Sequence, residues 1–259
     1  MGIMEQREPK ILLYDLEVSR DIVEGYGNRW EFKVVKTIRH QELMCYAYKW
    51  LGTKKTVFVS RHDFKTYKEF VISLWELINA ADVVIAHNAN KFDNKMANRF
   101  FVKEELRPVS PYRSIDTLQV ARSNFKFQSN GLNDLGEYLG LGKKEKITYA
   151  DLEEDFMSDR PSSKTVRAMK KYNIQDITLL EAIYLRLLPY IKNHPNLSVI
   201  SQKPDTCPRC GGNHLQSRGQ AISNTAIYKR FQCTDCGGWT RLRLQDKEDG
   251  QLKSTYVNV

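Results

Sequence analysis

The chain has 259 residues, 41% of them hydrophobic, which suffices for one well-buried domain of about 200 residues and a second small module. Its 40 Lys and Arg residues exceed its 31 Asp and Glu residues, and the net charge of +9 favours a polyanionic partner such as nucleic acid. No segment approaches the roughly 18 consecutive apolar residues of a membrane span, and the N-terminus lacks the apolar region of a secretion signal. We therefore expect a soluble, cytoplasmic protein with no membrane partner.

The chain opens with a group of strand patterns. Residues 10–19, KILLYDLEVS, form a β-rich run interrupted by two acidic residues, which predicts a strand entering the core. A loop rich in Arg, Lys and aromatic residues is expected over about 18–40. Residues 42–52 and 54–60 then predict an antiparallel hairpin that continues the sheet. Apolar residues at helical spacing predict a helix over 63–80.

Strands and helices alternate in the next part of the chain. Residues 82–88, DVVIAHN, are nearly continuously apolar, as in a strand that is covered on both faces. Four further segments are predicted: a helix over 93–106, a short strand running into a helix over 114–125, a short helix over 131–140, and a long helix over 165–191. Three meandering strands followed by this alternation predict an α/β fold with an RNase H-like mixed sheet flanked by helices.

Two carboxylates, Asp15 and Glu17, lie two residues apart on the first predicted strand. Side chains at this spacing leave the same face of a strand, so they can converge on one point. Two acids on an otherwise apolar strand repel each other and resist burial unless a cation neutralises them, which argues for a divalent metal. The alternative is a pair of solvated acids on an edge strand.

Two later elements carry further candidates. Asp93 follows the strand at 82–88 and opens the next helix, and ligand sites in open α/β sheets gather beyond the strand ends. Helix capping explains Asp93 equally well. Tyr172 and Asp176 are four residues apart on the last predicted helix and so share a face. Taken alone, this pair also fits a Tyr at the core edge beside a solvated Asp.

In combination, these residues resemble the DEDD superfamily of 3′-to-5′ exonucleases, in the subgroup with a tyrosine in the third motif (DEDDy). The first motif is matched by YDLEVS, the second by HNANKFD and the third by YNIQD, over about residues 10–190. The segment at 116–140 looks like the one that precedes the third motif in that superfamily. Within it, the chain looks similar to the stand-alone, phage-type exonucleases related to the proofreading domains of B-family DNA polymerases. If it is phage-encoded, the expected location is the host cytoplasm.

The resemblance implies phosphodiester hydrolysis with two Mg²⁺ or Mn²⁺ ions as cofactors. Asp15 would bridge both ions, and Glu17 and Asp176 would complete the site that activates water. Asp93 would hold the second ion, partly through water. Tyr172 would orient the attacking water, because its ordinary pKa near 10 makes it a poor base at neutral pH.

The second motif also implies contacts with the substrate. Asn88 would hydrogen-bond to the 3′-terminal nucleotide and Phe92 would pack against it, whereas a turn-capping Asn and a core Phe are the alternatives. Three cations on the following helix can meet phosphates, although solvated positions are the default for them. They are Lys91, Lys95 and Arg99.

Four of the five cysteines form two Cys-x-x-Cys pairs near the C-terminus, each followed by two glycines that permit a tight turn. These cysteines are Cys207, Cys210, Cys233 and Cys236. Their spacing predicts a zinc ribbon that holds one structural Zn²⁺. Basic and aromatic residues lie on or beside it, namely Arg218, Tyr228, Lys229, Arg230, Phe231, Trp239, Arg241 and Arg243. They suit single-stranded nucleic acid, a small core within the ribbon, or docking on a replication protein.

The sequence predicts an exonuclease domain over 1–193, a linker over 194–206, a zinc ribbon over 207–245 and a polar tail over 246–259. The expected function is removal of nucleotides from the 3′ end of DNA, preferably single-stranded, in replication or proofreading. A DNA polymerase or another replication protein is the expected partner. A 3′-to-5′ exoribonuclease, or a catalytically silent protein that binds nucleic acid through the ribbon, are the alternatives.

Overall fold

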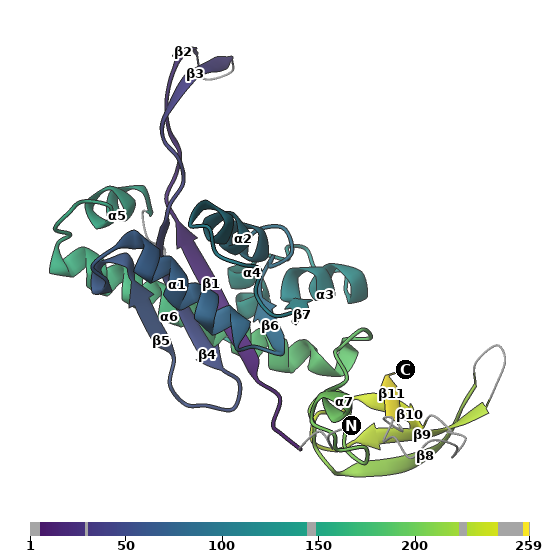
Figure 1. Cartoon of the computed structure of the whole chain (residues 1–259). Coiled ribbons are helices and arrows are strands. Elements are labelled where there is room, and N and C mark those ends of the chain that lie inside the picture. The colour runs from purple at the N-terminus through teal and green to yellow at the C-terminus, as the bar shows by residue number, and fades with distance from the viewer. Residues whose placement is uncertain (1–5, 29–30, 144–148, 223–226, 243–255, 259) are drawn as a thin grey trace.

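A five-stranded mixed sheet forms the centre of the structure, a computed structural model that describes residues 6–28, 31–143, 149–222, 227–242 and 256–258. Its strand order is β5-β4-β1-β6-β7. The strands are β1 (Ile11–Val18), β4 (Leu43–Trp50), β5 (Val57–Ser60), β6 (Val83–Ala86) and β7 (Arg113–Asp116). β1, β4 and β5 pair antiparallel, and β6 and β7 extend the sheet in parallel with β1. The predicted RNase H-like α/β architecture is confirmed (Figure 1).

Helices cover both faces of this sheet (Figure 1). One face packs against α1 (Tyr67–Asn79) and α2 (Asp93–Lys103). The other packs against α6 (Ser163–Leu187), which in turn contacts α3 (Thr117–Asn124) and α4 (Leu132–Tyr138). Two 3₁₀ turns, η1 (Arg61–Asp63) and η2 (Leu188–Tyr190), precede α1 and end α6.

The alternation of side chains along β1 explains how it serves both layers. Leu12, Tyr14 and Leu16 belong to the core under α1 and α2. Ile11 and Leu13 belong to the core under α6. Because side chains two residues apart share a face, the next positions of the α6-facing row are those of the two acids of the first motif. The strand therefore delivers its carboxylates toward α6.

The expected loop over 18–40 is wrong. These residues form a hairpin of β2 (Ile22–Gly27) and β3 (Phe32–Arg39), which is a separate two-stranded sheet that stands away from the domain (Figure 1). Most of its side chains are exposed on both faces. The apolar-polar alternation that marks a half-buried strand is therefore absent, and only the Val, Ile, Tyr and Phe content indicates strands.

The sequence pattern did not predict the helix α5 (Tyr149–Phe156). Its Phe156 is buried against Cys45 and Met169. Its Glu153 is also buried and accepts hydrogen bonds at 2.7 Å from both the backbone N–H and the Nε of Arg20, at the foot of the hairpin. α5 therefore closes the core beside β4 and holds one side of the hairpin base.

The C-terminal part is a second sheet of order β11-β10-β9-β8. Its strands are β8 (Leu215–Ile222), β9 (Ile227–Cys233), β10 (Trp239–Leu242) and β11 (Tyr256–Asn258). Within the segment expected as a polar tail, 246–259, residues 256–258 form β11, which pairs with β10; the rest of that range lies outside the described residues. No helix among the described residues is long and apolar enough to cross a membrane.

The segment expected as a linker, 194–206, is packed against the larger domain. It contains the helical turn α7 (Leu197–Ile200), and Leu197 is buried in the core under α6. His194 is only 4% exposed; its Nδ1 contacts the carbonyl oxygen of Pro195 at 2.7 Å, and its Nε2 lies 2.9 Å from the hydroxyl of Tyr184. Because the carbonyl can only accept, Nδ1 carries the proton and the neutral Nε2 accepts from Tyr184.

Burial lowers the pKa of His194 to about 4, well below its ordinary value near 6.5. A depressed folded-state pKa contributes stability that is present above pH 6.5 and is lost as the pH falls toward 4. We expect the free energy of unfolding, measured by urea titration, to fall between pH 6.5 and 5 by about 2 kcal/mol more in the wild type than in His194→Gln. His40→Gln, at an exposed histidine, should keep the wild-type dependence. The same pH dependence of the unfolding free energy in the wild type and in His194→Gln would contradict this role of His194.

Candidate active site

Three carboxylates from two distant segments meet where β1 runs beside α6. Asp15 and Glu17 lie on β1, Asp176 lies on α6, and each offers an oxygen such that all three atoms are within 4.8 Å of one another. Glu17 and Asp176 are buried, with exposed fractions of 9% and 3%, and Asp15 is half-buried. Carboxylates packed this closely repel one another in their ionised forms. All three donors are hard oxygens, so the group fits a divalent cation such as Mg²⁺ or Mn²⁺.

A buried amide fixes one of these carboxylates. Asn173 is fully buried on α6, and its Nδ2 donates to Oδ2 of Asp15 at 2.7 Å. Its Oδ1 is also buried and has no hydrogen-bond partner among the described residues. Asn173 therefore orients the Asp15 carboxylate through a hydrogen bond from the buried face of α6. The sequence carried a signal for it, because Asn is unfavourable in a helix interior unless its side chain has a specific partner.

Asp93 lies beside this group but not within it. It opens α2 on the other face of the sheet, is 2% exposed, and its Oδ1 accepts the backbone N–H of Leu16 at 3.2 Å. β6 ends at Ala86, so the end of β1 has no strand partner on that side, and Asp93 takes this place. Burial raises the pKa of Asp93 to about 7, and the negative charge of Asp116 adds to the shift.

Tyr172 lies half-buried one helical turn before Asp176 on α6. Burial raises the pKa of its hydroxyl, and the charges of Asp176, Glu17 and Asp15 raise it further. The hydroxyl therefore stays protonated at neutral pH, where it can donate or accept a hydrogen bond but cannot serve as a base.

The loop before α2 is held by a residue that the sequence analysis did not single out. Asp116, which is buried at the end of β7, accepts the backbone N–H groups of Asn88 at 2.9 Å and Asn90 at 3.2 Å. It also caps α3. Asn88 adopts a φ of 69°, in the left-handed region that Asn tolerates better than most residues. Phe92 is 39% exposed, so it is not a core residue. An Asp at a strand-to-helix junction is the capping signal that could have identified Asp116.

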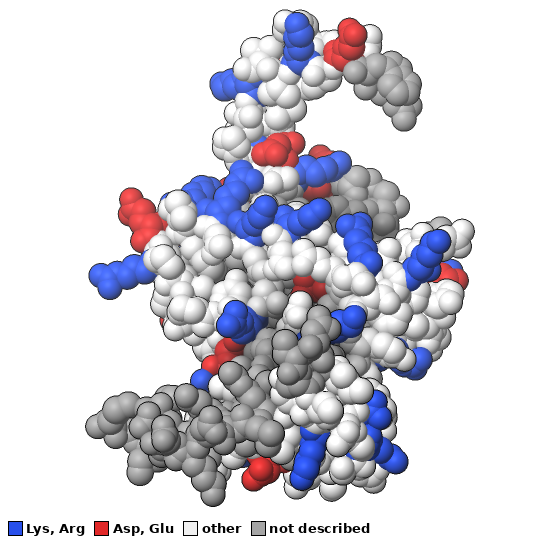
Figure 2. Space-filling view, turned by 90° about the vertical axis from the view of Figure 1, so that its right-hand side faces the viewer, with Lys and Arg blue, Asp and Glu red and all other residues white. Residues whose placement is uncertain are grey.

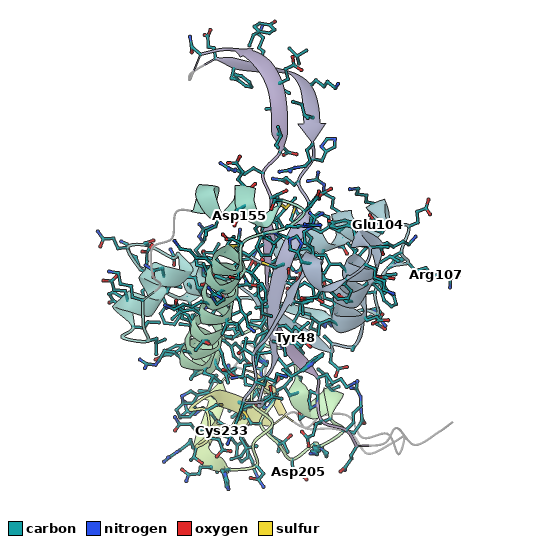
Figure 3. All side chains as sticks on the ribbon, turned by 90° about the vertical axis from the view of Figure 1, so that its left-hand side faces the viewer. Tyr48, Glu104, Arg107, Asp155, Asp205 and Cys233 are labelled. Carbon is teal, nitrogen blue, oxygen red and sulfur yellow. The ribbon has the colours of Figure 1, made fainter. Side chains whose placement is uncertain are left out.

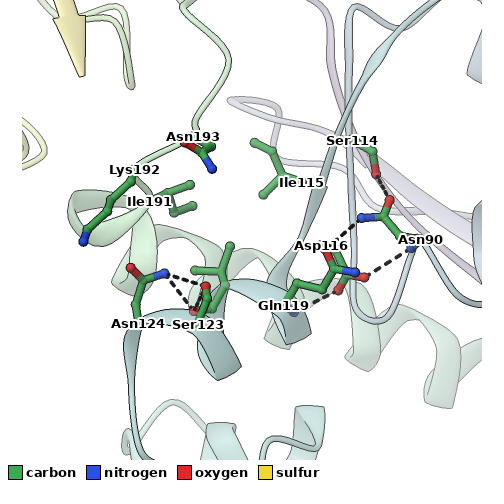
Figure 4. A pocket seen from close by; sticks show the side chains of 11 residues that line it. Asn90, Ser114, Ile115, Asp116, Gln119, Ser123, Asn124, Ile191, Lys192 and Asn193 are labelled. Carbon is green, nitrogen blue, oxygen red and sulfur yellow. Dashed lines mark hydrogen bonds between the residues drawn. The ribbon is translucent and has the colours of Figure 1, made fainter. Parts of the chain in front are cut away.

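A hollow of about 290 Å³ lies next to this loop, between α3 and the segment that follows η2 (Figure 4). The side chain of Asn90 in this hollow already has hydrogen-bond partners. Its Nδ2 donates to Gln119, and its Oδ1 accepts from Ser114. The hollow contains Asp116 but none of the three clustered carboxylates.

The four cysteines form a second cluster, in which all sulfur atoms lie within 4.8 Å of one another. Gly211 and Gly237 adopt φ values of 75° and 76°, which L-residues rarely take, and the N–H of the glycine after each approaches a cysteine Sγ at 3.4 Å. Four sulfurs in this arrangement fit a tetrahedral Zn²⁺ site, and the closed ligand set indicates a structural role.

This cysteine cluster is docked on the larger domain. Cys210 and Cys236 pack against the core under α6. Arg209 is 2% exposed; its Nε donates to the carbonyl oxygen of Ile191 at 3.0 Å, and its Nη1 donates to that of Trp239 at 2.6 Å. The ribbon is therefore continuous with the core of the larger domain. Cys233 lies at the end of the molecule opposite the β2–β3 hairpin (Figure 3).

Two arginines stack on aromatic rings on the ribbon sheet. Arg230 lies 4.8 Å from the ring centre of Trp239, and Arg241 lies 4.6 Å from that of Tyr228. Trp239 is 37% exposed and the other three are half-buried, so these rings lie at the surface of the sheet and do not form a closed core. Arg218, Lys229 and Phe231 lie on the flanking strands β8 and β9, whereas Arg243 lies outside the described residues.

Loss of zinc should destabilise the whole chain, because two of the proposed ligands rest on the main core. We expect the wild type to hold one zinc ion, and we expect Cys210→Ser to lose it and to lower the melting temperature by roughly 5 °C or more in one cooperative transition. Cys45→Ala, which changes a buried cysteine distant from the cluster, should keep its zinc. Zinc content by atomic absorption and calorimetry measure both. A separate ribbon transition, with the main transition unchanged, would contradict this coupling.

The sequence comparison gives a family for this geometry. Residues 22–188 match the RNase_H superfamily, a range that includes Asp93 and Asp176 and begins after Asp15 and Glu17. No match was found among curated proteins.

The solved structures give a fold. The chain is similar to the family B DNA polymerase from the hyperthermophilic archaeon Pyrobaculum calidifontis, with a TM-score of 0.52 and 13% sequence identity. The similarity covers 86% of this chain and 32% of the polymerase chain, so this chain spans about a third of the polymerase. At this identity the likeness concerns the fold alone. Since the superfamily match extends over more than half of the sequence, the chain belongs to the RNase H superfamily.

Proposed function

We propose that this chain is a metal-dependent 3′-to-5′ exonuclease of the DEDDy type that removes nucleotides from single-stranded DNA ends. One observation carries the proposal: Asp15, Glu17 and Asp176 place carboxylate oxygens within 4.8 Å of one another, although Asp176 is about 160 residues away from the other two in the sequence. Tyr172 lies one turn away, and Asp93 lies against the strand backbone between the two β1 acids. Membership of the RNase H superfamily supports a nuclease.

The residues divide into ligands and a positioning group. Asp15, Glu17 and Asp176 would hold one Mg²⁺ or Mn²⁺ ion, and Asp15 with Asp93 would hold a second. When bound, the ions supply charge neutralisation at the scissile phosphate and lower the pKa of a coordinated water. A nearby cation also favours the ionised form of Asp93, which burial alone disfavours. Tyr172 keeps its proton and orients the attacking water.

The second-motif loop would receive the terminal nucleotide. Asp116 holds the backbone of Asn88, which leaves the Asn88 side chain available to hydrogen-bond to the 3′-terminal nucleotide. Phe92 is exposed beside Asp93, where its ring can pack against a sugar or base. The preference for DNA over RNA, and for a phage-type exonuclease that works beside a DNA polymerase or another replication protein, rests on the sequence resemblance.

The domain boundaries remain part of this proposal: an exonuclease domain over 1–193, a packed connection over 194–206 and a ribbon over 207–245. The ribbon would hold one structural Zn²⁺ through Cys207, Cys210, Cys233 and Cys236.

The decisive test uses 5′-labelled single-stranded DNA and RNA with Mg²⁺ or Mn²⁺. We expect a ladder that shortens from the 3′ end of DNA, and a rate reduced by roughly 10²–10³-fold or more in Asp15→Ala, because the proposed bridging ligand is removed. Asp159→Ala, at an exposed acid outside the cluster, should match the wild type. A ladder on RNA alone would assign an exoribonuclease. No ladder on either substrate, with tight DNA binding, would assign a silent binding protein.

Asn173 gives a second test, because it acts only through Asp15. We expect Asn173→Ala to lower kcat by roughly 10–100-fold and to raise the Mg²⁺ concentration for half-maximal activity, with little change in KM for DNA. Thr178→Ala, at an exposed position on the same helix, should change neither quantity. If Asn173 served only packing, the melting temperature would fall while the metal dependence stayed that of the wild type.

A further inference from the structure

The β2–β3 hairpin has an arrangement of charges that its sequence spacing hides. Lys33, Lys36 and Arg39 are each three residues apart, a spacing that places successive side chains on opposite faces of a regular strand. In this hairpin, however, Lys33 pairs with Tyr26 and Arg39 pairs with Ile22. Lys36 pairs with Glu24. The three partners on β2 are two residues apart, so they and the three cations share one face.

Two register shifts produce this alignment. The pairing of β3 skips Val35 between Lys36 and Val34, and it skips Ile38 between Arg39 and Thr37. Each shift inserts one extra residue between successive cations, as a β-bulge does, and so returns the next cation to the same face. Lys33 and Lys36 are exposed, and adjacent cations lie roughly 7 Å apart, at two positions along the ladder.

The base of the hairpin is fixed to the domain on two sides. On one side, Arg20 forms an ion pair with the buried Glu153 of α5 at 2.7 Å. On the other, Arg99 of α2 donates to the side chain of Gln41, the second residue after β3, at 2.9 Å. The base of the hairpin is therefore held in a defined position, although its tip makes little contact with the domain (Figure 1).

The hydrogen bond from Arg99 to Gln41 brings a second row of cations to the base of the hairpin. Lys95 and Arg99 are exposed four residues apart on one side of α2, and Lys91 is exposed in the turn before the helix. This row begins beside Asp93, at the start of α2, and ends at the foot of the hairpin. Lys and Arg side chains gather over this part of the molecule in Figure 2.

We propose that this row and the cationic face of the hairpin form one track for the phosphate backbone of a nucleic acid whose 3′ end lies at the carboxylates. The inference rests on the proposed function, because it uses the position of that site. Tyr26, which is 64% exposed next to Lys33, offers a ring on which a base can stack.

A protein partner on the opposite face of the hairpin is the competing interpretation. That face carries Phe32 and Val34, which are 52% and 55% exposed. The cations favour nucleic acid, because both bulges align them and because further exposed cations, Lys95 and Arg99, lie on α2 between the base of the hairpin and Asp93. Glu24 is the acid on the same face, opposite Lys36. A protein that bound only the apolar face would not require the aligned lysines.

The test measures binding of a fluorescein-labelled 30-nucleotide single strand to the full chain by anisotropy, without Mg²⁺ or Mn²⁺, over a range of salt concentrations. We expect Lys33→Ala/Lys36→Ala to weaken binding roughly 5- to 20-fold and to reduce the slope of log K against log salt by about 1.4, which is about 0.7 for each phosphate that is no longer neutralised. Both lysines are exposed, so the melting temperature should not change.

The matched control is Lys54→Ala/Lys55→Ala, which removes two exposed lysines from the β4–β5 turn, at the other end of the sheet. It should bind within twofold of the wild type. The inference is overturned if the hairpin variant also binds within twofold, or if both variants lose affinity equally. Binding is measured without catalytic metal, so it is independent of the nuclease assay. A wild type that binds DNA here but does not cut it in the nuclease assay would contradict the proposed exonuclease activity and would leave the proposed binding track supported.

Discussion

The repulsion among Asp15, Glu17 and Asp176 is the constraint around which the domain is arranged. Three carboxylates held this close and largely buried are unfavourable in their ionised forms unless a cation lies among them. The surrounding fold must therefore hold them in place without the help of mutual attraction. β1, at the centre of the sheet, and the 25-residue helix α6 do so, because both are anchored by apolar residues on either side of the acids.

The same core joins the two proposed metal sites. Ile177 and Tyr184 continue along α6 from Asp176 into the core on which Cys210 and Cys236 rest. The hydroxyl of Tyr184 also forms a hydrogen bond with His194, which lies in the segment between α6 and the ribbon. The ribbon thus covers apolar surface that the larger domain would otherwise expose to water. The cysteine cluster therefore rests on the same core as the helix that carries Asp176 and Tyr172.

Much of the fold could be predicted from the sequence, because its strands and helices have buried faces with clear periods. The β-rich run at 10–19, the nearly continuous apolar run at 82–88 and the helical spacing at 63–80 predicted two central strands and a helix that covers them. The convergence of Asp15 and Glu17 followed from the period of two. The hairpin at 22–39 could not be predicted in this way, since a strand exposed on both faces has no apolar-polar alternation. Asn173 and Asp116 each carried a local signal, but the groups that they hold, Asp15 and the loop at Asn88, come from distant segments that a local pattern does not identify.

The two register shifts in β3 also bear on how copies of this chain behave at high concentration. A two-stranded hairpin leaves unpaired N–H and C=O groups along both of its edges, and such edges can add a strand from another molecule. Irregular pairing at Val35 and Ile38 interrupts the edge of β3, and the charges of Lys33 and Lys36 oppose the approach of an identical edge. The features that align the cations on one face therefore also oppose self-association through the edge of this exposed hairpin.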